Sequence, residues 1–103
     1  MFVGSLWARL LLRQSRTLKD KRQVVKSIKD RLRNGFNVSV AEVDAQDNRQ
    51  LAVLGVAMVG ESAHHVRTTL QQIAQALRAH PIAELLDQEI EVLDGVHPER
   101  GAS

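Results

Sequence analysis

The sequence contains no cysteine and few aromatic residues. Its 103 residues include no Cys, no Tyr, one Trp and two Phe. The absence of cysteine excludes disulfide bonds, thiolate metal ligands and a thiol nucleophile, and it is typical of proteins kept in a reducing cytoplasm, the location that we expect here. Three aromatic side chains and no segment like the RNP1 pattern also argue against a sheet that stacks several RNA bases, as RRM domains do.

Long apolar segments are also missing. No stretch approaches the roughly 20 apolar residues that span a lipid bilayer. The first 15 residues, MFVGSLWARLLLRQS, are apolar in part, but Arg9 interrupts them and no cleavage site of small residues is evident. We therefore interpret this segment as a strand and not as an export signal, and we expect no membrane partner.

Negative charge is scarce in the first third of the chain. Residues 1–33 hold ten of the fourteen Lys and Arg residues but only two acids, Asp20 and Asp30, whereas the rest of the chain carries four basic and ten acidic side chains. The formal net charge of +2 therefore hides a strong asymmetry. Such asymmetry suggests a polyanionic partner if the fold keeps the two charges on different surfaces, although pairing between antiparallel strands would neutralise part of it.

The spacing of apolar residues predicts six secondary-structure elements. Alternation predicts strands, with the even-numbered residues of the first strand facing a core, and a spacing of three to four residues predicts helices. The turn-rich segment DAQDN predicts a hairpin between the second and third strands. The predicted elements are a strand at 2–12, a helix at 18–35, strands at 36–43 and 50–59, a helix at 66–77 ending before His80-Pro81, and a strand at 84–93.

This βαββαβ order predicts a single α+β, ferredoxin-like domain over residues 1–94, with a flexible C-terminal tail at 95–103. Right-handed crossovers place both helices on one face of a four-stranded antiparallel sheet, with the first and third strands in the centre. The other face stays uncovered, and Val3, Trp7 and Leu11 are expected on it. An apolar face of this kind predicts a homodimer, with a ligand platform as the weaker alternative.

The segment TLKDKRQVVKSIKDRLRN, residues 17–34, contains seven Lys or Arg residues. Most of them recur every three or four positions and form a stripe beside the apolar stripe of the helix. Such a stripe can contact phosphates, with binding that weakens steeply as salt is added. We predict a nucleic-acid-binding surface formed by Arg16, Lys19, Lys21, Arg22, Lys26, Lys29 and Arg33.

Two other interpretations of this stripe remain open. The charges would only solubilise an exposed helix if Asp20 and Asp30 supply local ion pairs, and the sequence leaves this interpretation about level with phosphate binding. Alternatively, the chain is a homodimeric interaction module whose basic helix docks an acidic protein.

No catalytic centre is visible, so we expect neither an enzyme nor a metal or cofactor site. Three acids around the hairpin could hold a cation, but solvated turn charges are far more common; they are Glu42, Asp44 and Asp47. The four histidines lack the spacing of a zinc site: His64, His65, His80 and His97. Glu89 and Glu91 share one strand face, where ion pairs with Arg9 and Arg13 are the better interpretation than acid–base catalysis. There is no GxSxG, P-loop or GxGxxG motif.

Three segments carry a resemblance to a known family: SRTLKDKR at 15–22, FNVSVAEVDAQD at 36–47 and AVLGVAMV at 52–59. The chain resembles, up to about residue 94, the YlxP-like bacterial family, a conserved domain of unknown function. This resemblance implies a ferredoxin-like domain of uncharacterised activity. Because family members are often encoded beside translation and ribosome-maturation factors, it also implies structured RNA or a ribosomal precursor as partner.

The match to the family is uneven along the chain. The basic helix motif is intact at Leu18, Lys19, Lys21 and Arg22. The turn after AEVDAQD departs from the pattern, with Ala45 where a histidine is expected, and with Arg49 and Leu51 in the region where family members carry a tryptophan and then an arginine. The resemblance therefore assigns no role to the turn between Ala45 and Leu51.

Overall fold

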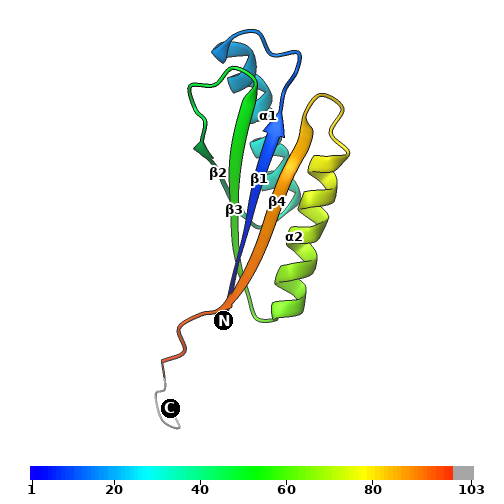
Figure 1. Cartoon of the computed structure of the whole chain (residues 1–103). Helices are drawn as coiled ribbons and strands as arrows, with labels where there is room; N and C mark the ends of the chain where they lie inside the picture. The colour runs from blue at the N-terminus through cyan, green and yellow to red at the C-terminus, as the bar shows by residue number, and fades with distance from the viewer. Residues whose placement is uncertain (99–103) are drawn as a thin grey trace.

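Six elements form in the predicted order. The computed structural model describes residues 1–98 and confirms the α+β, ferredoxin-like fold (Figure 1). The elements are β1 (Phe2–Leu11), α1 (Leu18–Gly35), β2 (Ser39–Asp44), β3 (Leu51–Gly60), α2 (Ala63–Arg78) and β4 (Glu84–Asp94). β2 begins three residues later than predicted because Phe36 ends α1: its backbone is extended, and its N–H donates to the Leu32 carbonyl over 2.9 Å.

All strand pairs of the sheet are antiparallel, in the order β2-β3-β1-β4. The central positions of β1 and β3 are those predicted. The register places Trp7 of β1 opposite Gly55 of β3 and Glu89 of β4. The buried residues of β1 have even numbers, as predicted, and the two helices cover that face of the sheet while the other face stays open (Figure 1).

The core lies between the sheet and the two helices. Leu6, Ala8 and Leu10 of β1 are buried against apolar residues of both helices. Gly4 allows α2 to approach β1 closely, because a Cβ atom at this position would lie 2.3 Å from Cγ1 of Val66 and 2.7 Å from Cδ1 of Leu70. The α2 helix is therefore fixed to the sheet by tight apolar packing.

Each helix begins at a side-chain cap. Thr17 and Asp20 form a capping box at α1: the hydroxyl of Thr17 accepts from the Asp20 N–H over 3.1 Å, and the Asp20 carboxylate accepts from the Thr17 N–H over 3.3 Å. Ser62 caps α2 by accepting from the His65 N–H over 3.2 Å. The Asp20 carboxylate, which we considered as an ion-pair partner for the stripe, is thus engaged in the helix cap.

The chain after β4 continues without helix or strand through residue 98. The Gly95 N–H donates to the Met1 carbonyl over 2.7 Å, and Nε2 of His97 contacts a carboxylate oxygen of Asp94. Of the predicted flexible tail, residues 99–103 lie outside the described residues. Within residues 1–98, neither helix is long and apolar enough to cross a lipid bilayer.

Candidate functional site

Five of the predicted site residues lie together on one flank of α1. This flank is turned towards β2, because Nη2 of Arg33 donates to the carbonyl of Val40 in that strand over 2.9 Å. Four of the five side chains are exposed and Lys29 is half-buried. We call this set the basic flank; it consists of Lys19, Arg22, Lys26, Lys29 and Arg33.

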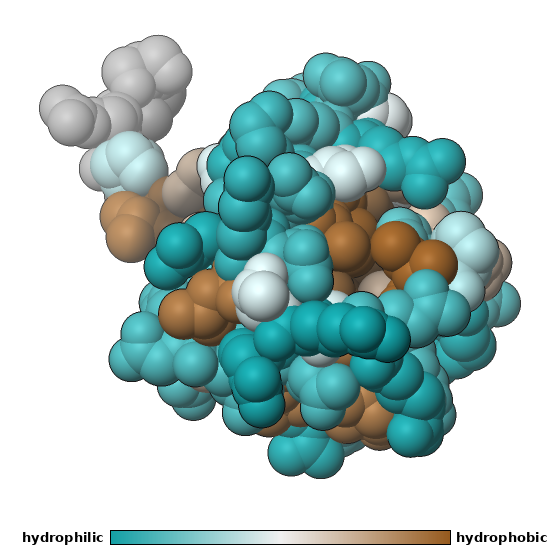
Figure 2. Space-filling model, turned by 90° about the horizontal axis from the view of Figure 1, so that it is seen from above, coloured by the Kyte–Doolittle hydropathy of each residue, from teal (hydrophilic) through white to brown (hydrophobic). Residues whose placement is uncertain are grey.

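Arg16 and Arg49 extend the basic flank beyond the start of α1. Both are exposed, and Nη1 of Arg49 donates to the carbonyl of Arg16 over 3.4 Å. A second link between these two loops runs from Nε2 of Gln50 to the carbonyl of Arg13 over 3.1 Å. In the view from above, this end of the molecule is covered mostly by hydrophilic side chains (Figure 2). Our sequence prediction missed Arg49, because only the fold brings it to Arg16.

Carboxylates neutralise only part of the basic flank. Asp30 lies 3.0 Å from Nζ of Lys26 and 3.8 Å from Nη1 of Arg33. Within residues 1–98, Lys19, Arg22 and Lys29 have no carboxylate oxygen within 4.0 Å. The flank therefore presents uncompensated positive charge to the solvent.

Lys21 does not belong to this surface, and its prediction as a nucleic-acid contact is corrected. The side chain is completely buried. Its Nζ lies 2.6 Å from the Ala45 carbonyl oxygen, 3.0 Å from that of Leu51 and 3.3 Å from that of Gln46. Position 21 falls on the face of α1 that buries Val25, Ile28 and Leu32, so helical spacing already indicated this location.

The ammonium group of Lys21 also forms an ion pair with Glu42. Nζ lies 2.8 Å from Oε2 of Glu42, a buried oxygen. The three N–H donors of the ammonium group are therefore shared among this carboxylate and three carbonyls, and Glu42 supplies the opposite charge. Ala45 takes a left-handed backbone conformation, with φ of 60°, where its carbonyl is bound by Lys21. Lys21 thus fixes the hairpin turn to α1 and thereby positions Arg49 beside Arg16.

The acids of β4 lie at the opposite edge of the sheet from the basic flank. The predicted ion pairs of Arg9 and Arg13 with Glu89 and Glu91 do not form. Arg13 pairs instead with Glu84, with Nη2 3.0 Å from Oε2, because the register places Glu89 and Glu91 opposite Trp7 and Ser5. The sheet order separates the acids of β4 from β2, whereas Glu42, Asp44 and Asp47 lie in or next to β2 at the edge that α1 covers, so only part of the charge asymmetry becomes a separation in space.

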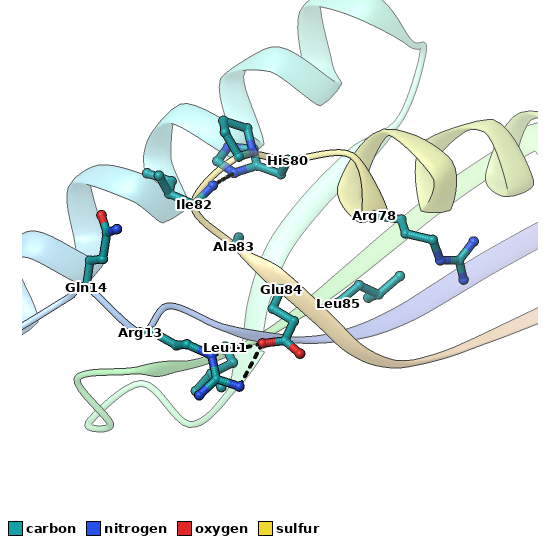
Figure 3. Close-up of a pocket in the computed structure, with 10 residues that line it drawn as sticks. Leu11, Arg13, Gln14, Arg78, His80, Ile82, Ala83, Glu84 and Leu85 are labelled. Carbon is teal, nitrogen blue, oxygen red and sulfur yellow. Dashed lines mark hydrogen bonds and ion pairs between the residues drawn. The ribbon is translucent and has the colours of Figure 1, made fainter.

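A hollow of about 400 Å³ lies beside the ion pair of Arg13 and Glu84 (Figure 3). Arg78 and His80 also line it, and Figure 3 shows Arg78 turned away from the ion pair. Burial lowers the pKa of His80 below its ordinary value of 6.5, and the charge of Arg31 lowers it further. The hollow brings no nucleophile next to a base.

The acidic side chains of the hairpin do not come together at one site. Glu42 is paired with Lys21, and a carboxylate oxygen of Asp44 accepts from the N–H of Ala45 over 2.7 Å. Among the residues that the structure describes, no group of three or more His, Asp or Glu side chains is placed to hold a metal ion.

Comparison with known proteins identifies the family of this chain. A family model described as "Protein of unknown function (DUF503)" matches residues 3–90, from β1 into β4. The chain belongs to this family. It is also 32% identical over 82 residues to the "Uncharacterized protein YlxP" of Bacillus subtilis (strain 168), a match that covers 80% of this chain and 89% of that protein.

The matched range contains all of α1 and the hairpin, so the candidate site lies within the DUF503 domain itself. The predicted resemblance to YlxP-like proteins is confirmed. Both descriptions leave the activity open, so a function for this domain has to be argued from the surface of the molecule.

Proposed function

We propose that this protein is a non-catalytic module that binds structured RNA, such as a ribosomal precursor, through the basic flank of α1. The observation that supports this proposal is the row of outward cations beside β2, of which Lys19, Arg22 and Lys29 have no carboxylate partner within residues 1–98. A rigid helix fixes the spacing of these cations, so only their side chains have to be ordered when phosphates bind.

The dimensions of the flank suit a phosphate backbone. From Lys19 to Arg33 the helix rises about 21 Å, at about 1.5 Å per residue. Arg16 and Arg49 continue the positive surface past the start of the helix. Several phosphates of one RNA segment can therefore be contacted at the same time.

The mode of recognition follows from what surrounds the flank. Trp7, the only tryptophan, lies on the open face of the sheet and not beside α1. Phe36 follows α1 but is half-buried against the core. The flank therefore offers no exposed aromatic platform of the RRM kind, and we expect RNA to be recognised by its shape and backbone rather than by sequence.

The test is equilibrium binding of a fluorescently labelled RNA hairpin over a series of salt concentrations. The flank variant is Lys19→Glu/Arg22→Glu, and the matched control is Arg67→Glu/Arg78→Glu on α2, which changes the net charge equally. Each lost phosphate contact lowers the slope of log K against log salt by about 0.7 to 0.9. We expect the flank variant to lose more than tenfold in affinity and roughly 1.5 in slope, and the control to bind like the wild type within about twofold.

Two outcomes would contradict this proposal. Equal weakening in both variants would show that only the net charge matters and that α1 is not a specific surface. If the wild type does not bind RNA even at low salt, the basic flank has another partner, and the acidic protein considered from the sequence becomes the next candidate.

A further inference from the structure

The open face of the sheet is apolar in its centre. Val59 is 61% exposed, Val43 51% and Trp7 36%. The strand register places Trp7 and Val59 with Val3 and Ala57 on the face that the helices do not cover, and Val43 lies against Gly55 on the same face (Figure 1). We call this surface the open face. Contiguous apolar surface on a domain this small is typical of an interaction site.

Charged residues border this apolar surface along its β4 side. Asp87, Glu89 and Glu91 lie along β4, which is an edge strand, and Arg9 of the central strand β1 lies opposite Asp87. Charged residues at the border of an apolar patch are common at protein–protein interfaces, because they stay hydrated when the patch is buried.

The shape of the open face is complementary to that of a second copy of the same face. Trp7 stands between two hollows, of which the one towards β2 has a volume of about 460 Å³ and is walled by Trp7, Ala41 and Val43. Gly55 and Ala57 form its floor. Any side chain at position 55 would collide with Val43, since a Cβ atom there would lie 2.9 Å from Cγ1 of Val43. A large aromatic side chain thus lies directly beside a space bounded by small and branched residues.

We propose that the open face binds a second copy of this chain about a two-fold axis, with Trp7 of each copy filling the apolar hollow of the other. A two-fold axis brings the same patch of both copies together, so the protruding Trp7 of each copy faces the hollow of the other. Tryptophan in the centre of an interface commonly carries a large share of the binding energy.

The available area is sufficient for such a dimer. A strand of ten residues is about 33 Å long and four strands span about 19 Å, which gives a face of roughly 600 Å². Two such faces bury about 1,200 Å² together, at the lower limit of specific and stable interfaces. We therefore expect association in the micromolar range. The dimer leaves α1 of each copy on the outside, and it does not depend on RNA binding.

The test combines the molar mass in solution with the fluorescence of Trp7. Light scattering at increasing protein concentration should give a mass that rises from that of one chain, 11.5 kDa, to that of two. Because Trp7 is the only tryptophan, its emission reports on this face alone and should shift to shorter wavelength over the same concentration range.

The variant Ala57→Glu places a charge in the centre of the open face, whereas Ala76→Glu makes the same change on the exposed side of α2. We expect Ala57→Glu to remain monomeric at ten times the concentration at which the wild type dimerises, and Ala76→Glu to dimerise like the wild type. Circular dichroism checks that both variants fold.

A wild type that stays monomeric up to about 200 µM would overturn the proposal. So would a dimer that persists in folded Ala57→Glu, or a dimer whose formation leaves the Trp7 emission unchanged, because either result places the interface elsewhere. Should Ala57→Glu fail to fold, the concentration dependence of Trp7 emission in the wild type still decides.

Discussion

The two edges of the sheet differ in charge and in the way their helices are attached. Both helices bury an apolar face against the sheet, but α1 at the β2 edge is held in addition by polar groups: buried Lys21 binds the hairpin turn, and Arg33 binds Val40. At the β4 side, α2 is attached by apolar packing, with Gly4 of β1 making room for Val66. The basic flank lies at the first edge and the exposed acids of β4 at the second.

This difference shows that the cations of α1 have two separate roles. Lys21 is turned inward, where it holds the hairpin, and Lys19 and Arg22 are turned outward without a carboxylate within residues 1–98. Only the second group is free to meet a polyanion. Substitutions of inward and outward cations of α1, and of the contacts that attach each helix to the sheet, test this comparison.

The largest effect is expected at Lys21. The variant Lys21→Met keeps the apolar stem but leaves Glu42 without its counter-charge and three carbonyls without their donor. Removing one member of a buried ion pair costs about 3 to 5 kcal/mol of the free energy of unfolding. Urea unfolding measures this loss, with Lys19→Met as the control on the same helix, where a surface change is expected to cost less than about 0.5 kcal/mol.

A second variant identifies the cause of this loss. Lys21→Met/Glu42→Leu removes both charges and should recover part of the stability, because an unpaired buried carboxylate is more costly than an apolar pair. A cost below 1 kcal/mol for Lys21→Met alone would contradict the role of Lys21 as the anchor of the hairpin.

A smaller effect is expected where α2 is attached by packing. Gly4→Ala inserts a methyl group between β1 and α2 where Val66 and Leu70 leave no space. Overpacking of a core costs about 1 to 3 kcal/mol, again measured by urea unfolding. Gly35→Ala at the end of α1 is the matched control, because no atom beyond its chain neighbours and its own helix backbone lies within 4 Å of the added group. Equal losses in both variants would contradict the tight approach of α2.

A still smaller effect, of opposite sign, is expected at Lys19. This residue lies in the first turn of α1, where the positive end of the helix dipole repels a cation. Lys19→Glu should therefore raise the free energy of unfolding by about 0.3 to 1 kcal/mol, although it removes a proposed RNA contact. A clear loss of stability in this variant would show that Lys19 has a structural role like that of Lys21.

The sequence was sufficient for the fold because its patterns are local. Alternation and helical spacing predicted every element, and the parity of β1 identified the face that is buried. The start of β2 was misplaced because Phe36 continues the alternation of Val38 and Val40, although its N–H completes the last turn of α1.

The candidate site could be predicted only in part because two of its features depend on distant residues. Helical spacing places Lys21 on the buried face of α1, but lysine is seldom buried unless it is paired, and the partners that accept its charge lie 21 to 30 positions further along the chain. Arg49 meets Arg16 across 33 positions. The outward cations needed no such contacts, so helical spacing alone placed them together.

The smallest effect on stability is expected at His80, which lies where α1 and α2 meet. Its pKa is lowered by burial first and by the charge of Arg31 second, so the folded state favours the neutral imidazole. The unfolded chain then binds a proton more readily than the folded one. The contribution of His80 to stability is therefore complete above the ordinary pKa of 6.5 and is lost as the pH falls from there through the lowered pKa.

Two arginines of the same helix turn separate the causes of this pKa shift. Arg31 lines a hollow with His80 between the helices, whereas Arg33 is turned towards β2. In an NMR titration of the imidazole, Arg31→Gln should raise the pKa of His80 only part of the way back, because burial is the larger cause, and Arg33→Gln should leave it unchanged. If the two variants raise the pKa equally, the charges of α1 act on His80 as one diffuse field, and the division of this helix into a flank that faces β2 and a flank that faces α2 has no electrostatic consequence.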